Sequence, residues 1–211
     1  MIRRHTGARW NQRLCAVLLA ASLAVTACTS KPAYYRHDAA GVAPGSRVAV
    51  LPLVNMTKDM NAPDVVLNAL VVELLATQHF VVIDPGVVDD VIVRERIRLT
   101  DRVPLETLRS LGATLGVDYV FVGSVSEYQM SKQSQDLIPT VAIALRMVSC
   151  STGAIAWAST HARRGSDTES IFTIGRVETL EELTTLAARE MARTVVPPSG
   201  RKPPHQEVSR P

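Results

Sequence analysis

The stretch from Gly116 to Arg163 constrains the fold of this chain more than any other. It contains three successive runs of β-type residues, and Ser151-Thr152-Gly153 separates the last two. Gly153 can adopt the positive φ that such a hairpin turn needs. Side chains alternate between two faces along each run, and one face is rich in alanine, with Ala142, Ala144, Ala154, Ala156 and Ala158. We therefore expect a β-sheet as the frame of the protein, with a helix packed closely against its alanine side.

The flanking residues predict the elements that cover this sheet. Capping residues, prolines and apolar periodicity place a strand or a helix in each segment. We expect strands at Arg47 to Val54 and Phe80 to Ile83, and helices from Asn61 to about Gln78, from Asp84-Pro85 towards Leu99, from Pro104 to Gly116, and after the capping box that begins at Thr179. The order predicts a single α/β domain, a mixed sheet with helices packed on it.

The helix predicted from Asn61 to Gln78 is apolar around most of its circumference. Only a thin strip through Asp64, Asn68, Glu73 and Thr77 is polar. A helix of this kind is covered on more than one side. Two interpretations remain open: burial between the sheet and another helix, or contact of part of this face with a second subunit.

The first residues have the pattern of a secretory signal. Arg3, Arg4, Arg9 and Arg13 precede an apolar run of about a dozen residues from Leu14 to Val25, which is too short to span a bilayer. The run ends in Val25-Thr26-Ala27-Cys28, which resembles the lipobox of bacterial lipoproteins, in which the cysteine is acylated with palmitate-type chains. The alternative is an ordinary cleaved signal followed by a chance cysteine.

These patterns divide the chain into four parts. Residues 1–27 are expected to be the signal peptide, 28–46 a tether without apolar periodicity, 47–196 the α/β domain, and 197–211 a proline-rich, disordered tail. The whole chain carries 23 basic and 20 acidic residues, but four of the arginines precede Cys28, which leaves 19 basic residues and a net charge of −1. Because a nucleic-acid binder needs a basic face, we expect no nucleic-acid partner.

No pattern of residues predicts catalysis. The five histidines are far apart in sequence, and neither a nucleophile elbow, a phosphate-binding loop nor a metalloprotease motif occurs. We expect no enzyme activity, metal or cofactor.

Cys150 is expected to be a small apolar residue at a strand end, with a reactive thiol or an intermolecular disulfide as alternatives. Arg163-Arg164 with Asp167 and Glu169 predicts a solvated loop, or charge pairs across a subunit boundary.

Four segments in this order carry a family resemblance: RVAVLPLVN from Arg47, LLATQHFVVIDPG from Leu74, LGATLGVDYVFVGSVSEY from Leu111, and ALRMVSCSTGAIAWAS from Ala144. Together behind a lipobox they resemble the CsgG-like outer-membrane lipoproteins, from about Arg47 to Val195, and most closely the PelC and LpoB type.

A transmembrane hairpin needs two strands of about 9–11 residues. The gaps from Gln129 to Ile138 and from Gly165 to Val177 are too short for one.

The resemblance implies a non-enzymatic lipoprotein of the outer membrane that faces the periplasm. It implies a homo-oligomer that assists the export or assembly of a polymer, either exopolysaccharide or a curli-like fibre. The alternative is an LpoB-like activator of a penicillin-binding protein in peptidoglycan synthesis. The expected partners are the outer membrane, through lipidated Cys28, and proteins of export or of peptidoglycan synthesis. The short tether argues against the activator, which must reach an inner-membrane enzyme.

Overall fold

A computed structural model describes residues 31–37, 42–98, 102–133, 136–167 and 176–196. The predicted signal peptide, Cys28 and the predicted tail lie outside these residues. The elements are, in chain order, β1 (Ala33–Arg36), β2 (Ser46–Val50), β3 (Val54–Asn55), α2 (Ala62–Ala76), β4 (Phe80–Val82), α3 (Pro85–Arg94), α4 (Leu105–Leu115), β5 (Tyr119–Gln133), β6 (Asp136–Ser149), β7 (Ile155–Arg164) and α5 (Leu180–Val195).

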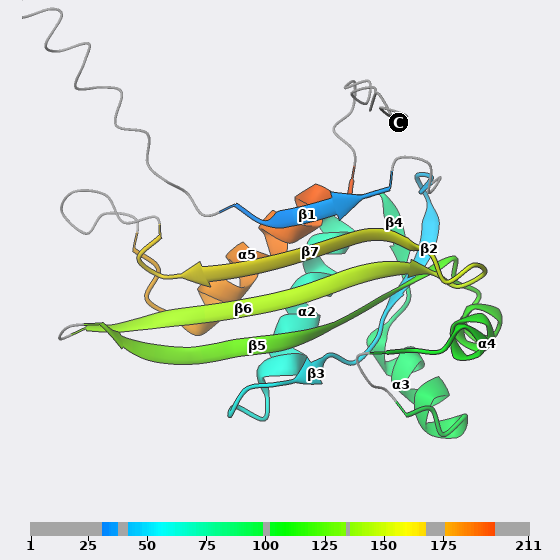
Figure 1. Cartoon of the computed structure of the whole chain (residues 1–211), viewed down its shortest axis with the longest axis horizontal. Coiled ribbons are helices and arrows are strands. Elements are labelled where there is room, and N and C mark those ends of the chain that lie inside the picture. The colour runs from blue at the N-terminus through cyan, green and yellow to red at the C-terminus, as the bar shows by residue number, and fades with distance from the viewer. Residues whose placement is uncertain (1–30, 38–41, 99–101, 134–135, 168–175, 197–211) are drawn as a thin grey trace, which may run out of the picture.

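The strands form one mixed sheet in the order β1-β7-β6-β5-β2-β4, and β3 pairs with β5 beside this path (Figure 1). The three strands expected from the sequence, β5, β6 and β7, are antiparallel neighbours at its centre. β2 runs parallel to both β5 and β4. The predicted α/β class and mixed sheet are therefore confirmed.

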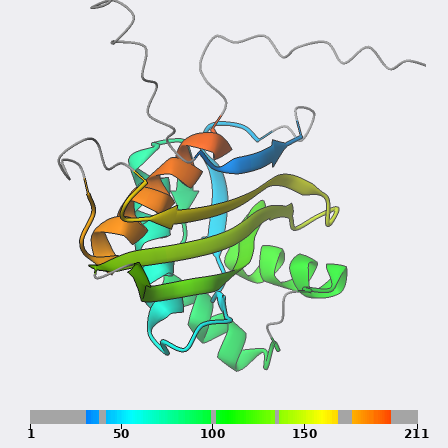
Figure 2. The same cartoon turned by 60° about the vertical axis from the view of Figure 1, so that its left-hand side comes forward.

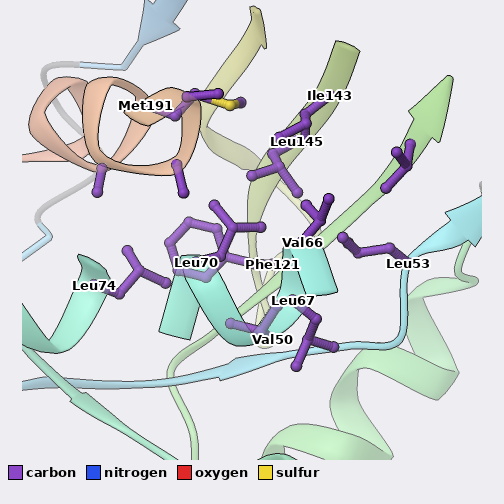
Figure 3. Close-up of a cluster of buried hydrophobic side chains, with 14 of the residues drawn as sticks. Val50, Leu53, Val66, Leu67, Leu70, Leu74, Phe121, Ile143, Leu145 and Met191 are labelled. Carbon is purple, nitrogen blue, oxygen red and sulfur yellow. The ribbon is translucent and has the colours of Figure 1, made fainter. Parts of the chain in front are cut away.

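Helices α2 and α5 lie side by side against one face of the sheet (Figures 1 and 2). The main core lies between them and the strands, and it contains Phe121 and Leu145 from the sheet, with Leu70 and Met191 from the helices (Figure 3). Trp157 of β7 belongs to the same core. Burial of α2 between the sheet and another helix is thus confirmed. Its remaining side is still open to solvent, with Val72 61% and Leu75 50% exposed.

The other face of the sheet is covered over only part of its width. Helices α3 and α4 pack there against the side chains of β2 and β5, with Ala49, Val120 and Val122 among the buried residues. Among the described residues no helix covers the alanine-bearing part of β6 and β7, where Ala144 and Ala158 are half-buried. The expected helix against the alanine side is wrong, because α5 packs on the opposite side, which carries the larger apolar residues.

Part of the segment predicted as a tether belongs to the sheet. Ala33–Arg36 pairs antiparallel with β7, with Tyr35 opposite Ala158 and Arg36 opposite Trp157. The Arg36 guanidinium also donates to the carbonyl oxygens of Thr194 and Val196 at the end of α5. The expectation of an unstructured stretch up to residue 46 is therefore wrong for these four residues, because partners distant in sequence hold them.

The polar stretch from Gln129 to Ile138 is also more regular than expected. β5 has 15 residues and β6 has 14, and their pairing continues to Gln133 opposite Asp136. A register shift between Val125 and Glu127 interrupts the hairpin. Most of the predicted gap is therefore strand. The stretch is mostly polar, with Met130 as its one apolar residue before Leu137, and the cross-strand ladder supplies the regularity that a single run does not reveal.

Several local signals are confirmed. Asp84 accepts a hydrogen bond from the Gly86 amide at the start of α3, and Thr179 accepts one from the Glu182 amide at the start of α5. Gly116 ends α4 at a φ of 65°, and Gly153 has a φ of 74° in the β6–β7 turn. Helix α3 is shorter than predicted: it ends at Arg94, and Arg96 follows with a φ of 53°.

Candidate interaction surface

The open half of the sheet forms a groove of about 560 Å³. Two rows of side chains cross the strands from β5 to β1 in this region. The first row is Val122, Arg146, Ala158 and Tyr35, and the second is Ser124, Ala144, Thr160 and Ala33. Ala33, Ala144 and Ala158 make a low centre, which we call the alanine floor, and the larger Arg146 and Tyr35 rise beside it. Among the described residues that line the groove, Arg146 is the one that carries a charge.

The exposed side of α2 is the second unpartnered apolar surface. Asp64, Asn68, Val72 and Leu75 follow one another at spacings of four, four and three residues and are all exposed. Since these spacings bring residues to the same side of a helix, the four form one line, which we call the α2 stripe. The buried residues of α2, such as Val66 and Leu70, face the sheet and α5. The α2 stripe therefore points away from the sheet.

A buried ionic cluster joins β7 to α5. The His161 Nε2 atom lies 2.5 Å from Glu190 Oε2, and the Arg163 Nε atom lies 3.5 Å from the same oxygen. The side chains of His161 and Arg163 are each 1% exposed, and that of Glu190 is 23% exposed. Arg163 Nη1 also lies 3.9 Å from Asp167. The predicted solvated loop is thus wrong for Arg163, which is inside the domain; Glu169 lies outside the described residues.

This cluster could not be found from sequence spacing. Alternation along β7 places His161 and Arg163 on the side that carries Trp157, which is the covered side. Glu190 is distant in sequence, and nothing in its neighbourhood distinguishes it from other acids on the exposed sides of helices. The arrangement is a charged contact between the final helix and the sheet, and the Glu190 side chain is its partly exposed member.

Cys150 behaves as the sequence predicts, as a small buried residue after the end of β6. It is 4% exposed and packs against Gly112 of α4, where an added Cβ would come within 2.6 Å of the cysteine Cβ. Burial raises the pKa of the Cys150 thiol to about 11, and the negative charge of Asp118 adds to this effect. The thiol is therefore protonated at neutral pH, and a thiol in that state is a poor nucleophile.

The raised pKa of Cys150 predicts a loss of stability in alkali. In the unfolded chain the thiol has its ordinary pKa of 9.0, so between pH 9.0 and about 11 the unfolded state loses this proton before the folded state does. The folded state then binds more protons, and the free energy of unfolding falls as the pH rises. We expect Cys150→Ala to reduce this fall. Urea unfolding of both proteins from pH 8 upwards measures it, and parallel curves for the two would contradict the assignment.

The described residues contain no group of three His, Cys, Asp or Glu side chains arranged to hold a metal ion. The same part of the chain has no helix that is long and apolar enough to cross a membrane. Of the histidines in this part, His37 lies near Tyr35, His79 lies against Phe80, and His161 belongs to the ionic cluster. His5 and His205 lie outside the described residues.

The described residues form an α/β domain with two open surfaces, the groove and the α2 stripe, and exposed apolar surfaces of this kind are common at sites of macromolecular contact. The chain belongs to the family of the peptidoglycan-synthase activator LpoB, whose model matches residues 17–162. This membership supports an accessory role in the cell envelope. No curated protein sequence matches the chain. The wider grouping with the CsgG-like proteins remains a prediction.

Solved structures of other proteins share this fold, among them the following two. A PelC dodecamer from Paraburkholderia phytofirmans has a TM-score of 0.55 at 18% identity, over 79% of this chain and 96% of that chain. Lipoprotein GNA1162 from Neisseria meningitidis has a TM-score of 0.50 at 21% identity, over 70% of this chain and 99% of that chain. At these identities the similarity shows the fold alone. The predicted likeness to the PelC and LpoB type is confirmed at that level.

Proposed function

We propose that this chain is an outer-membrane lipoprotein that faces the periplasm, self-associates, and assists the export or assembly of an extracellular polymer. It is anchored through acylated Cys28 and has no catalytic step of its own. The observation that carries the proposal is the position of β1. Ala33 begins this strand five residues after Cys28, and five residues extend at most about 18 Å. An anchor at Cys28 therefore holds the folded domain against the membrane surface.

A domain held this close acts at the membrane itself. This position suits an accessory of a machine that passes polymer through the outer membrane. It suits less well a protein that must cross the periplasm to reach another membrane. The PelC chain with the same fold forms a dodecamer, which supports self-association as the working state. The two open apolar surfaces described above are available for such contacts.

The second candidate is an activator of a penicillin-binding protein in peptidoglycan synthesis. The family model that matches residues 17–162 favours it, because that family is described by this activity. It requires reach towards the inner membrane, and the short connection between Cys28 and β1 opposes this. The two candidate functions therefore predict opposite effects of lengthening this connection.

Cys28→Ser tests the anchor. Serine cannot form the thioether to which the lipid is attached, so we expect the variant to incorporate no labelled palmitate. Cys150→Ser is the matched control, and we expect it to be labelled like the wild type because Cys150 is buried in the domain. Growth with radiolabelled palmitate, followed by immunoprecipitation, measures both. Equal labelling of Cys28→Ser and the wild type would contradict lipidation at this residue.

A flexible insertion distinguishes the two candidate functions. About 40 Gly and Ser residues placed between Ser30 and Lys31 would add a mean reach of roughly 35 Å without changing the fold. We expect this insertion to reduce the surface polymer of a deletion strain complemented with the variant. An activator would keep or increase its stimulation of peptidoglycan synthesis instead. Full polymer export by the insertion variant, with peptidoglycan synthesis dependent on the protein, would overturn the export proposal.

A further inference from the structure

The two open apolar surfaces lie on opposite sides of the same subunit. The groove lies on the face of the sheet that carries Ala144 and Ala158, and the α2 stripe lies on the outer side of a helix that covers the other face. When the groove of one copy binds the α2 stripe of a second copy, the first copy still has a free α2 stripe and the second still has a free groove. Such a head-to-tail contact repeats until the rotation closes a ring.

The groove and the α2 stripe also match in charge. Arg146 is the charged residue in the groove lining, and Asp64 is the charged residue of the α2 stripe. Burial and the negative charges of Asp64 and Asp90 raise the pKa of nearby Asp89, so this end of the stripe has a negative potential. A positive group from a neighbouring copy would be attracted there, and opposite charges across an interface fix its register.

Their dimensions agree as well. Asp64 and Val72 are eight residues apart on α2, which separates them by about 12 Å along the helix. Arg146 lies two strands from Tyr35, which separates them by about 10 Å across the sheet. With Asp64 beside Arg146, Asn68 lies over the alanine floor and Val72 reaches Tyr35. Small residues there let a helix approach the sheet closely.

We propose that the groove of one subunit binds the α2 stripe of a second copy of this chain, and that this is the interface through which the protein assembles. The inference rests on the self-association in the proposed function and specifies the surfaces that carry it. Val72 and Leu75 lose their exposure to water in this interface. The half-open face of the sheet gains a helix that the described part of its own subunit does not provide.

Two substitutions at exposed positions test the proposal in the full chain, solubilised in detergent. Thr160→Glu puts a carboxylate over the alanine floor, and Val72→Glu puts one in the α2 stripe; both residues are exposed in the subunit, so folding is preserved. We expect each variant to associate about 30-fold more weakly than the wild type, or worse, since it buries an unpaired charge at the interface. Light scattering and native mass spectrometry measure the subunit number. Val93→Glu is the matched control on α3, where Val93 is 76% exposed, and we expect wild-type assembly from it.

Mixing the two variants gives the decisive measurement. The Thr160→Glu subunit keeps an intact stripe and the Val72→Glu subunit keeps an intact groove. An equimolar mixture should therefore form a one-to-one heterodimer and stop there. Formation of this heterodimer also shows that both variants are folded.

The other outcomes overturn the proposal in recognisable ways. A wild-type protein that remains monomeric at all concentrations removes this interface and the self-association in the proposed function together. If both variants form the same oligomer as the wild type, this interface is contradicted and the proposed function is not. A mixture of the two variants that contains no heterodimer has the same meaning. Larger assemblies after deletion of residues 197–211 would show that this segment occupies the groove, and would also overturn the proposal.

Discussion

Replacement of Trp157 by alanine is expected to lower the free energy of unfolding by about 3–5 kcal/mol, the usual cost of removing a large buried aromatic side chain. Trp157 is 1% exposed at the centre of the main core. Its ring meets Phe121 edge to face, with ring centroids 6.0 Å apart, and its Nε1 atom donates to Thr194 Oγ1 at 3.1 Å. The side chain therefore joins β7 to β5 and to α5. Its loss is a large part of the 5–15 kcal/mol that stabilises most domains.

Trp157→Phe is the control for this prediction. Phenylalanine keeps the aromatic contact with Phe121 and loses the hydrogen bond to Thr194. The Thr194 hydroxyl still donates to the Met191 carbonyl oxygen, so no buried polar group is left without a partner. We expect a smaller loss than for alanine. Urea unfolding followed by far-ultraviolet circular dichroism measures both variants, and a loss of under about 1 kcal/mol for Trp157→Ala would contradict this account of the core.

Glu190→Leu is expected to lower the free energy of unfolding by about 3 kcal/mol. This substitution removes the carboxylate nearest to His161 and Arg163, which are almost completely buried. Breaking a buried ion pair from one side leaves the other charge poorly compensated and costs about 3–5 kcal/mol. We expect the lower end of this range of free energies because the Glu190 side chain is 23% exposed. The same unfolding measurement tests it.

A double variant separates the charge effect from a loss of packing. In Arg163→Met with Glu190→Leu both charges are gone, so we expect it to recover more than half of the stability lost in Glu190→Leu. Asp136→Asn is the exposed control. Asp136 is 64% exposed and pairs with Arg176 at 3.0 Å, so its change should be within about 1 kcal/mol. A double variant as unstable as the sum of its single variants would show that the cluster acts through packing alone.

The sequence predicts those parts of the fold that local chemistry determines. Asp84, Thr179 and Gly116 define helix ends through contacts within a few residues, and the structure has these ends where the sequence places them. Periodicity likewise identifies β6 and β7 and the covered helix α2. These signals need no knowledge of distant partners, which is why a single sequence contains them.

The features that the sequence does not predict depend on distant partners. β1 has no apolar pattern of its own, and β7 holds it from more than 120 residues away. Alternation divides β6 and β7 into two faces, but it does not say which face α5 covers. The larger residues, Ile143, Leu145 and Met147, gain more from burial than alanines do, so α5 packs on their side. The opposite face of β6 and β7 is therefore left open as the groove, and the sequence does not predict this groove as a site.

Under the proposed function, the pairing of β1 with β7 also affects the order of events during secretion. Tyr34 is opposite Ser159, so the strand nearest the proposed anchor finds its partner only after most of the chain has crossed the inner membrane. Contacts so distant in sequence form slowly, because a long loop must close first. Until then the edge of β7 is unpaired and available to any other extended chain. Completion of this sheet edge thus reports that the chain has arrived as far as β7, and the proposed attachment of lipid at Cys28 can precede it.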